Sequence, residues 1–600
     1  MKINSPIYFL RVSVSQLVQG LSTGWFFKPR NFYSNLLLLL SCSFILFSCS
    51  SKKIKVDLIV SHAKVYTVDG GFAVLESFAI RDGKIVAVGT NASIAQVYEA
   101  DSSMDVQGKT ILPGLIDAHC HFVGYGLGLQ DCNLVGTKSF AEVIDRVKKY
   151  AATNKHEWIV ARGWDQNDWA VKEYPNNKLL DSLFPGKPII LKRIDGHAAL
   201  VSSEAMHRAK INDSTEVPGG EILHELIEGK SIHHKMIFIK GSATGILIDN
   251  AVDLVEKIIP QPDANTIRES LLAAQQNCFA VGLTTVDDAG LMKNQIDYID
   301  QLQKKGELKM RIYAMLSDSL PNYEYYLIHG PYKTDFLNVR SFKFYADGAL
   351  GSRGACLLKA YDDQTQWKGF LLNSEAHYIQ KMKLLAQKQF QVCTHCIGDS
   401  ANRLILSIYG NILSDTNISK QGIDRRWRIE HAQVVATSDI AWFGKFNIIP
   451  SVQPIHATSD MYWAEKRLGP FRVKTAYAYN DLLNAAGRLA LGTDFPVEEI
   501  NPMFTFYAAV TRQDQQHFPA GGFQMENALS KRNALMGMTS WAAYANFEEN
   551  EKGSIEPGKF ADFIILNEDP MTCSPEIIPT IKVLATYIAG QKVFERIEKK

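Results

Sequence analysis

Between about residues 110 and 550, short runs typical of strands alternate with longer runs typical of amphipathic helices. Helix-like runs such as 264–280 and 374–388 separate the strand-like ones. Eight strands joined in this way predict an α/β protein with a closed parallel (β/α)8 barrel of the TIM type, which we assign to residues 111–550. The strand-like runs cover 110–118, 282–287, 310–316, 340–346, 390–395, 427–431, 447–452 and 489–494.

Two parts of the chain depart from this alternation. Roughly 160 residues separate the first two strand-like runs, and 155–262 has an α/β pattern of its own, which predicts an insertion after barrel strand one. Residues 54–110 and 551–600 read as short strands with turns, including an Asp82-Gly83 hairpin signal. Because chain termini often lie close together, we expect both ends to form one small β-sandwich domain.

The N-terminal region carries a short apolar segment, 36–47, which ends at Phe47-Ser48-Cys49. Twelve residues are too few to span a bilayer as a helix but match the apolar region of a secretory signal. The segment resembles a bacterial lipoprotein signal peptide over 1–48, with Cys49 as the lipidated residue; a buried strand or helix is the alternative. We therefore expect a periplasm-facing lipoprotein of the bacterial cell envelope, in the outer or inner membrane.

Composition narrows the function classes. Lys and Arg number 64 and Asp and Glu 63, so the chain lacks the basic excess of a dedicated nucleic-acid binder. A mean hydropathy of −0.09 argues against a polytopic membrane protein. Nine cysteines in 600 residues are too few for a disulfide scaffold.

The first barrel strand ends in His119-Cys120-His121. Side chains alternate along a strand, so both imidazoles share a face with Asp117 and can hold one metal ion at the strand's carboxyl end. We expect Asp117 to orient one of the imidazoles. Two hydrogen-bonded histidines at a barrel rim are the alternative.

Lys343 lies between Phe342 and Phe344, which predicts that its amine faces the barrel interior if the two rings face the helices. A charged amine is costly to bury there. Such a lysine can react with CO₂ to form a carbamate that bridges two metal ions. A buried lysine paired with a carboxylate such as Asp347 is the alternative.

His395, His431 and Asp494 each end a later strand-like run. An aspartate at this point suits metal ligation and proton transfer, and a helix N-cap is the alternative. The candidate ligands therefore follow in the order His-x-His, Lys, His, His, Asp on predicted strands one, four, five, six and eight.

This ordered set resembles the amidohydrolase superfamily of metal-dependent hydrolases, and within it the branch that contains N-substituted formamide deformylase (amidohydrolase family 3). The similarity runs from about Val56 to Phe594 and includes 113–121, 343–353, 395–399 and 492–497. The resemblance implies one or two divalent ions, zinc in first place. His119, His121 and Asp494 would hold the first ion and His395 and His431 the second, with carboxylated Lys343 as the bridge.

The same resemblance implies roles in catalysis and substrate binding. Asp494 would take a proton from metal-activated water and pass it to the leaving nitrogen. The candidate substrate contacts are His197, Trp164, Asp165, Arg353, Gln453 and His456. A satisfied surface histidine is the alternative for His197, and core packing is the alternative for Trp164.

We therefore expect a hydrolase of carbon–nitrogen bonds other than peptide bonds, acting on an N-formyl or N-acyl amide. One alternative is a mononuclear, deaminase-type amidohydrolase with uncarboxylated Lys343. The other is a lipoprotein that binds a ligand without chemistry. The expected partners are a small-molecule amide and, through the lipid anchor, a membrane; no nucleic acid is expected, and a homodimer stays open.

Overall fold

The computed structural model describes residues 52–228 and 238–597. The predicted signal peptide and Cys49 lie outside these residues. Among the helices that are described, none is long and apolar enough to cross a membrane.

A parallel barrel forms the centre of the fold, as predicted. Its strands follow the order β22-β21-β20-β19-β18-β16-β15-β8, and short β17 (Tyr332–Lys333) adds antiparallel to β18. The residues after β22 pair with the end of β8: Asp494 N donates to His119 O at 2.7 Å, and His121 N donates to Phe495 O at 2.9 Å, which closes the barrel. The barrel strands are β8 (Leu115–Cys120), β15 (Leu283–Leu291), β16 (Arg311–Ser317), β18 (Leu337–Tyr345), β19 (Gln391–Cys396), β20 (Arg428–His431), β21 (Ile449–Val452) and β22 (Ala490–Leu491).

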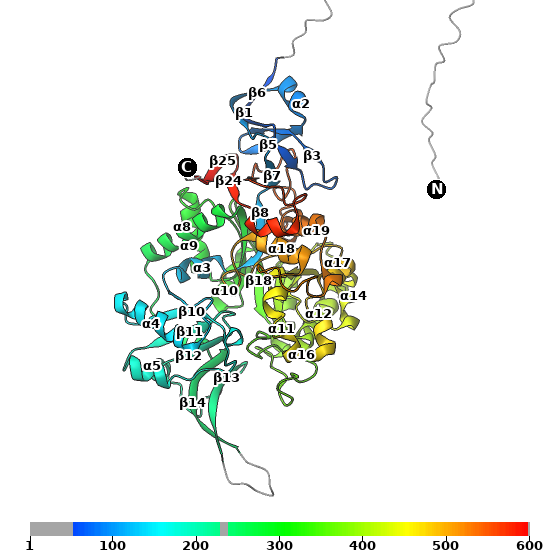
Figure 1. The fold of residues 1–600 in the computed structure, drawn as a ribbon. Coiled ribbons are helices and arrows are strands. Elements are labelled where there is room, and N and C mark those ends of the chain that lie inside the picture. The colour runs from blue at the N-terminus through cyan, green and yellow to red at the C-terminus, as the bar shows by residue number, and fades with distance from the viewer. Residues whose placement is uncertain (1–51, 229–237, 598–600) are drawn as a thin grey trace, which may run out of the picture. The chain divides into compact units, whose positions relative to one another are not determined.

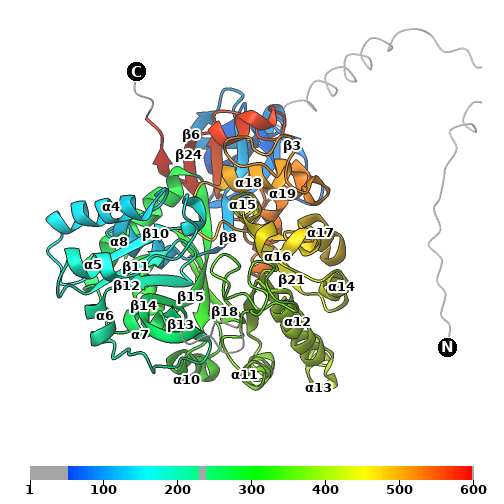
Figure 2. The same ribbon diagram turned by 60° about the horizontal axis from the view of Figure 1, so that its bottom comes forward.

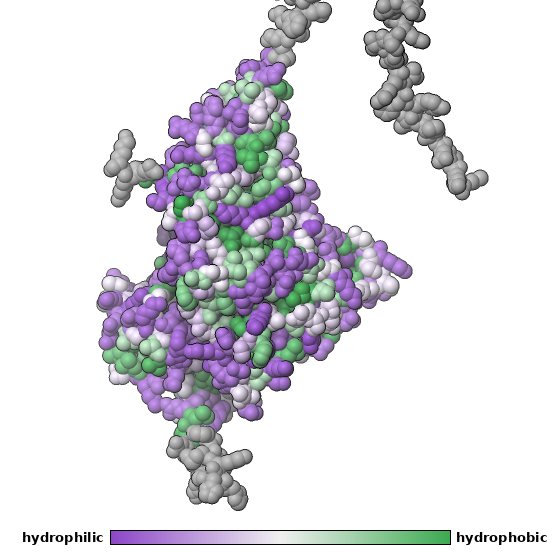
Figure 3. All heavy atoms as spheres, turned by 45° about the vertical axis from the view of Figure 1, so that its right-hand side comes forward, coloured by the Kyte–Doolittle hydropathy of each residue, from purple (hydrophilic) through white to green (hydrophobic). Residues whose placement is uncertain are grey.

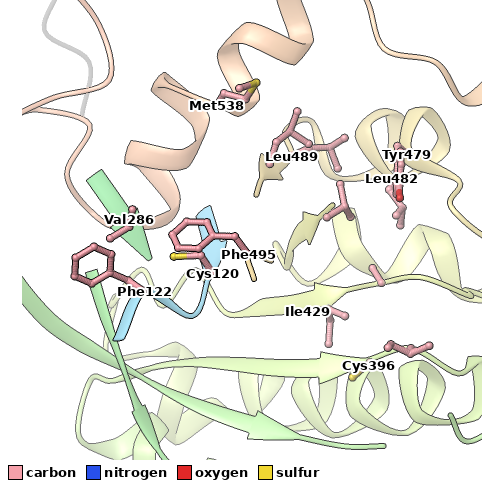
Figure 4. Close-up of a cluster of buried hydrophobic side chains, with 14 of the residues drawn as sticks. Cys120, Phe122, Val286, Cys396, Ile429, Tyr479, Leu482, Leu489, Phe495 and Met538 are labelled. Carbon is pink, nitrogen blue, oxygen red and sulfur yellow. The ribbon is translucent and has the colours of Figure 1, made fainter. Parts of the chain in front are cut away.

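Helices cover the outside of the barrel. Asp263 caps α8 and Ser374 caps α11, each accepting a hydrogen bond from a backbone N–H in the first turn. Figure 4 shows part of the apolar core at the strands and their covering helices, including Ile429 and Leu482. Burying one such side chain stabilises the fold by about 1.5–3 kcal/mol. The helices are α8 (Ala264–Ala280), α9 (Lys293–Lys304), α10 (Leu320–His329), α11 (Glu375–Gln387), α12 (Asp399–Ser414), α14 (Thr437–Lys445), α15 (Pro454–Asp460), α16 (Ala464–Arg472), α17 (Tyr479–Ala486), α18 (Pro502–Thr511), α19 (Lys531–Gly537) and α20 (Ser540–Ala545).

A mixed sheet makes up the insertion, which follows β8 and α3 (Phe122–Gly128). Its order is β13-β14-β12-β11-β10-β9. The sheet begins at Cys132, earlier than the predicted 155, because β9 has only two residues and no recognisable pattern. Its elements are β9 (Cys132–Asn133), α4 (Phe140–Thr153), β10 (Ile159–Trp164), α5 (Lys178–Leu183), β11 (Ile189–Arg193), β12 (Ala198–Val201), α6 (Ser203–Arg208), β13 (Gly220–Glu228), β14 (Phe238–Asp249) and α7 (Asp253–Glu256).

Both ends of the described chain build a β-sandwich, as predicted (Figures 1 and 2). One sheet has the order β5-β4-β1-β6 and the other β25-β24-β23-β7-β2-β3. Phe78 of the first sheet meets Phe563 of the second edge to face, with ring centroids 5.1 Å apart. The strands are β1 (Ile54–Ser61), β2 (Lys64–Tyr66), β3 (Val74–Leu75), β4 (Ser77–Arg81), β5 (Lys84–Gly89), β6 (Tyr98–Asp105), β7 (Thr110–Pro113), β23 (Phe563–Leu566), β24 (Val583–Ile588) and β25 (Gln591–Glu595), with α2 (Asn91–Val97) beside them.

The predicted first barrel strand, 110–118, is in fact two strands divided at Gly114. β7 belongs to the sandwich and pairs with β23 and β2, whereas β8 opens the barrel. A Cβ at Gly114 would stand 2.2 Å from Thr284 Oγ1, so a side chain does not fit between the two domains. The close approach of Thr284 to the backbone therefore explains why residue 114 is a glycine. The sequence shows no break there because β7 and β8 are both buried and apolar residues continue from one into the other.

Hydrophilic residues surround small groups of hydrophobic ones on the face shown in Figure 3. The larger apolar clusters lie inside, in the barrel wall, the insertion and the sandwich. The barrel, the insertion and the sandwich therefore each have a hydrophobic core of their own, which holds in place the elements that surround the site.

Candidate metal centre

The six predicted ligands converge at the carboxyl ends of the barrel strands. Lys343 Nζ lies 3.1 Å from His119 Nε2, which places the amine inside the barrel as the alternation predicts. Asp494 Oδ1 lies 3.2 Å from His121 Nε2 and 3.5 Å from His119 Nε2. The first group of predicted ligands is thus assembled around one carboxylate.

The second group lies directly against the first. The ring centroids of His395 and His431 are 4.5 Å apart, and those of His119 and His431 are 4.9 Å apart. Potential ligand atoms of His119, His431 and Asp494 all lie within 4.8 Å of one another. The tightest set therefore takes members from both predicted groups.

Two ligands have left-handed backbones, with φ of 71° at His431 and 63° at Asp494. Strict alternation would turn His431 away from the interior face that Glu430 occupies. The left-handed residue ends the strand, which releases the imidazole from that alternation. Such conformations cost about 1–3 kcal/mol each and cluster at functional sites.

Neighbouring side chains hold two of the imidazoles. His119 Nδ1 lies 2.5 Å from Glu430 Oε2, and His431 Nδ1 lies 2.8 Å from Gln453 Oε1. Arg428 donates from Nε to Glu430 at 2.7 Å. The two hydrogen bonds to Nδ1 atoms direct the Nε2 atoms of the same rings toward the centre. The second ring nitrogen of a metal-binding histidine is commonly held by a hydrogen bond in this way.

The orienting role expected for Asp117 was wrong. Its carboxylate accepts hydrogen bonds from Thr493 N and Oγ1 at 3.0 and 2.7 Å, and burial raises its pKa to about 7. Glu430, which the sequence reasoning missed, orients His119 instead. The available signal was Arg428-x-Glu430, two charged residues on one face of a short strand that is buried throughout.

Burial sets the protonation of the centre. It lowers the pKa of His119 to about 4, with help from the charge of Lys343, and holds those of His395 and His431 well below the usual range. Burial also lowers the pKa of Lys343. Although burial opposes it, the hydrogen bond from His121 and the nearby imidazoles hold the pKa of Asp494 well below its usual range.

These donors fit a divalent metal. Neutral imidazoles and an ionised carboxylate are the states that bind metal. Within the described chain, the buried Nε2 atoms of His395 and His456 have no hydrogen-bond partner. Nitrogen and carboxylate donors suit zinc, and also manganese, iron or cobalt.

A cavity of about 590 Å³ opens over the centre and is walled on one side by the insertion. Three predicted substrate contacts line it: His197, Asp165 and His456. His197 Nδ1 bonds Asp249 at 2.6 Å, and its ring lies 5.1 Å from that of His395. His456 Nε2 lies 3.8 Å from Asp494 Oδ2.

Three other predicted contacts lie away from the cavity wall. Trp164 is 1% exposed in the core of the insertion and donates to Leu191 O, so core packing describes it. Arg353 bonds Asp363 at 2.9 Å. Gln453 positions His431 instead of facing a substrate.

Other carboxyl groups that sequence reasoning did not single out also line the cavity, Asp460 and Glu498 among them. Burial raises the pKa of Asp460 to about 7 and that of Glu498 to about 8. Glu498 accepts a hydrogen bond from Ser459 at 2.6 Å. Both follow barrel strands in the sequence, which was the only signal for them.

The chain is similar to a known protein family, to named proteins and to solved structures. The family model described as Amidohydrolase family matches residues 103–594. Protein LONG AFTER FAR-RED 3 of Arabidopsis thaliana is 32% identical over 90% of this chain and 91% of its own, and N-substituted formamide deformylase of Arthrobacter pascens is 24% identical over 90% and 98%. An uncharacterized metal-dependent hydrolase from Pyrococcus horikoshii shares the fold, with a TM-score of 0.67 and 24% identity over 86% of this chain and 99% of its own.

Proposed function

The chain belongs to the amidohydrolase family, and we propose that it hydrolyses a small, non-peptide amide, of the N-formyl or N-acyl type, with divalent metal. One observation carries the proposal: four imidazoles, a lysine and an aspartate meet at the barrel mouth beneath one cavity. The similarity to N-substituted formamide deformylase supports the choice of bond.

The proposed ligands are His119, His121 and Asp494 for one ion and His395 and His431 for the other. When bound, such ions polarise a carbonyl oxygen and lower the pKa of water to about 7. Asp494, ionised and buried, accepts the proton of the attacking water and delivers it to the leaving nitrogen. His197 lies over His395 with its ring held by Asp249, where it can donate to the substrate's oxygen.

We propose that Lys343 is carboxylated. The residue is 1% exposed, and burial lowers the pKa of its amine, which favours the neutral and nucleophilic form. The nitrogen would form a bond to the carbon of CO₂ and lose one proton, which gives an anionic carbamate. That anion would bridge the two ions.

One observation favours a second candidate, a mononuclear amidohydrolase of the deaminase type. Ligand atoms of His119, His431 and Asp494 lie within 4.8 Å of one another, so three donors suit a single ion without Lys343 as a bridge. In this scheme the lysine stays uncarboxylated and a single ion is bound. The number of bound ions distinguishes the two candidates.

We also propose that the chain is a periplasm-facing lipoprotein anchored through Cys49. The apolar segment before Ser48-Cys49 supports this assignment. Metabolic labelling with a fatty acid would mark the wild type and spare Cys49→Ser; labelling of both would contradict the anchor.

An amine-release assay on the full chain tests the activity. We expect turnover of at least one N-formyl, N-acyl or cyclic amide, and loss of about a thousandfold or more in Asp494→Asn, which removes the proton acceptor. Glu307→Gln, at a surface ion pair with Arg268, serves as the control. Substrate binding without turnover in zinc-loaded protein would contradict the proposal and favour a ligand-binding lipoprotein.

A further inference from the structure

Arg162 lines the cavity and stands directly before a bulge in β10. The pairing of β10 with β11 shifts register between Arg162 and Trp164, at Gly163 with φ of 116°. A Cβ at Gly163 would stand 2.5 Å from Val135. The bulge returns Trp164 to the core of the insertion while Arg162 lines the cavity.

Arg162 has no counter-ion in contact. Across the part of the chain that is described, no carboxylate forms an ion pair with its guanidinium; one terminal N–H donates to Ile194 O at 2.9 Å, and the buried Nε has no partner. The neighbouring cations are paired: Lys192 with Glu256 at 2.7 Å and Arg193 with Asp165 and Asp195. Arg162 therefore differs from Lys192 and Arg193 in having no carboxylate as its ion-pair partner within the described residues.

A second cation lies beside it. Arg162 and Lys192 occupy facing positions of the parallel strands β10 and β11, and both line the cavity. Gly196, with φ of 76°, approaches the guanidinium closely; a Cβ there would stand 3.4 Å from a terminal nitrogen. Backbone and sheet thus fix where the guanidinium sits.

The acidic groups of the cavity do not fill this position. Glu498 bonds Ser459, and Asp460 accepts from Tyr477 at 2.7 Å. Asp131, Asp195, Glu256 and Asp494 act on Arg162 only at longer range, and burial outweighs them and lowers its pKa. A guanidinium stays protonated nevertheless, so it presents a positive charge and free N–H donors to the cavity, a combination that favours an anionic acceptor.

We propose that Arg162 binds a carboxylate of the substrate, so that the amide cleaved at this centre carries an anionic group away from the scissile bond. This inference rests on the proposed function, because it places substrate in the same cavity. A planar guanidinium and a carboxylate form paired, charge-assisted hydrogen bonds. The substrate class is therefore a carboxylate-bearing amide instead of a neutral one.

Matched probes test the inference on the full chain. N-Formyl and N-acetyl amino acids place the carboxylate on the amine side, and monoamides of dicarboxylic acids place it on the acyl side. Each probe is compared with its carboxamide. We expect kcat/KM at least about tenfold higher for the carboxylate member of the favoured pair. Arg162→Met should lower kcat/KM for the carboxylate member much more than for its carboxamide, so that the ratio between them falls to about twofold or less.

Two further variants sharpen the result. Arg162→Lys keeps the charge and should retain part of the preference, and Arg268→Met, at a surface ion pair outside the cavity, should retain all of it. Equal turnover of both members in the wild type, or equal losses for both in Arg162→Met, would overturn the inference.

Calorimetric binding of the same probes separates this inference from the hydrolase proposal. If no probe is hydrolysed but carboxylates bind more tightly than carboxamides, and Arg162→Met loses the difference, the anion site stands and the proposed reaction fails. If carboxylates bind no better than carboxamides, the anion site fails whatever is hydrolysed.

Discussion

Glu430 fixes His119 from within the barrel and is itself held by Arg428, with both charges fully buried. Although burial opposes ionisation, Arg428 and His119 hold the pKa of Glu430 well below its usual range. The carboxylate therefore keeps its charge next to the centre. It sets which ring nitrogen of His119 faces the metal position.

Glu430→Gln should weaken metal binding about 10–100-fold, because the amide holds the imidazole less firmly and contributes no charge. Zinc titration of the metal-stripped full chain measures this effect. Glu307→Gln on the surface provides the matched control. An affinity equal to that of the wild type would show that Glu430 only fills space.

Asp460 should make the fold less stable as pH rises. Burial raises its folded pKa to about 7, so between the ordinary aspartate pKa of about 3.9 and pH 7 the folded state holds a proton that the unfolded chain has released. This contribution to stability is present below pH 4 and is lost progressively up to about pH 7. Asp460→Asn keeps an acceptor for Tyr477 and should remove this slope.

Denaturant unfolding of wild type and Asp460→Asn across pH 4–8 measures the difference. The variant should gain stability relative to the wild type as pH rises and reach a plateau above about pH 7. A constant difference over this range would contradict the raised pKa.

Alternation in short strands predicted which faces carry His119 and Lys343, because side chains on a strand follow a period of two. It could not predict Glu430 or Gln453 as partners of imidazoles, because those contacts join residues far apart in sequence. It also could not place His431, whose left-handed backbone breaks the period. For Trp164 the sequence left a substrate contact and core packing open, and the bulge at Gly163, which no local pattern indicates, places the ring in the core of the insertion.

At the scale of elements, the loop after β18 packs against the end of β14. Asp249 of β14 holds His197, and a Cβ at Gly348 of the loop would stand within 2.5 Å of both Asp249 carboxylate oxygens. This contact joins the insertion to the barrel beside the centre. It explains why a glycine is needed there despite an ordinary φ.

Gly348→Ala should therefore displace Asp249 and with it His197. We expect kcat/KM to fall about tenfold or more, since a shift of about 1 Å in a positioning group can have such an effect. Gly70→Ala, where a Cβ meets no atom within 4 Å, is the control. Unchanged kinetics in Gly348→Ala would show that the imidazole of His197 plays no part.

Elements with strong local signals were predicted closely. α8 coincides with the predicted 264–280, and α11 lies one residue inside 374–388 at each end, because caps and apolar periodicity define them locally. β9 could not be foreseen, since two residues carry no period and pair only through β10. The division at Gly114 depends on Thr284, which lies far away in the sequence.

At the scale of the whole molecule, a buried ion pair connects the barrel with the sandwich. Arg311 of β16 donates two hydrogen bonds to Asp562, at 2.6 and 2.9 Å, and their side chains are 1% and 4% exposed. Asp562 O also accepts from Gly114 N at the division between the domains. The ion pair and this backbone hydrogen bond thus join the two domains at one buried junction, beside the buried hydrogen bond from Thr586 Oγ1 of β24 to Phe279 O of α8 at 2.7 Å.

Arg311→Met should lower the free energy of unfolding by about 3–5 kcal/mol, because it leaves the Asp562 carboxylate buried without its partner. Urea denaturation of the full chain measures the change. Arg268→Met, which breaks an exposed pair, should cost less than about 1 kcal/mol. Equal losses in both variants would contradict a structural role for the buried pair.

Metal content by elemental analysis tests the central claim most directly, on the full chain purified without chelator. The account predicts about two divalent ions per chain in the wild type and a loss of about one or more in Lys343→Ala. It would be contradicted if the wild type bound no metal even after incubation with zinc and bicarbonate.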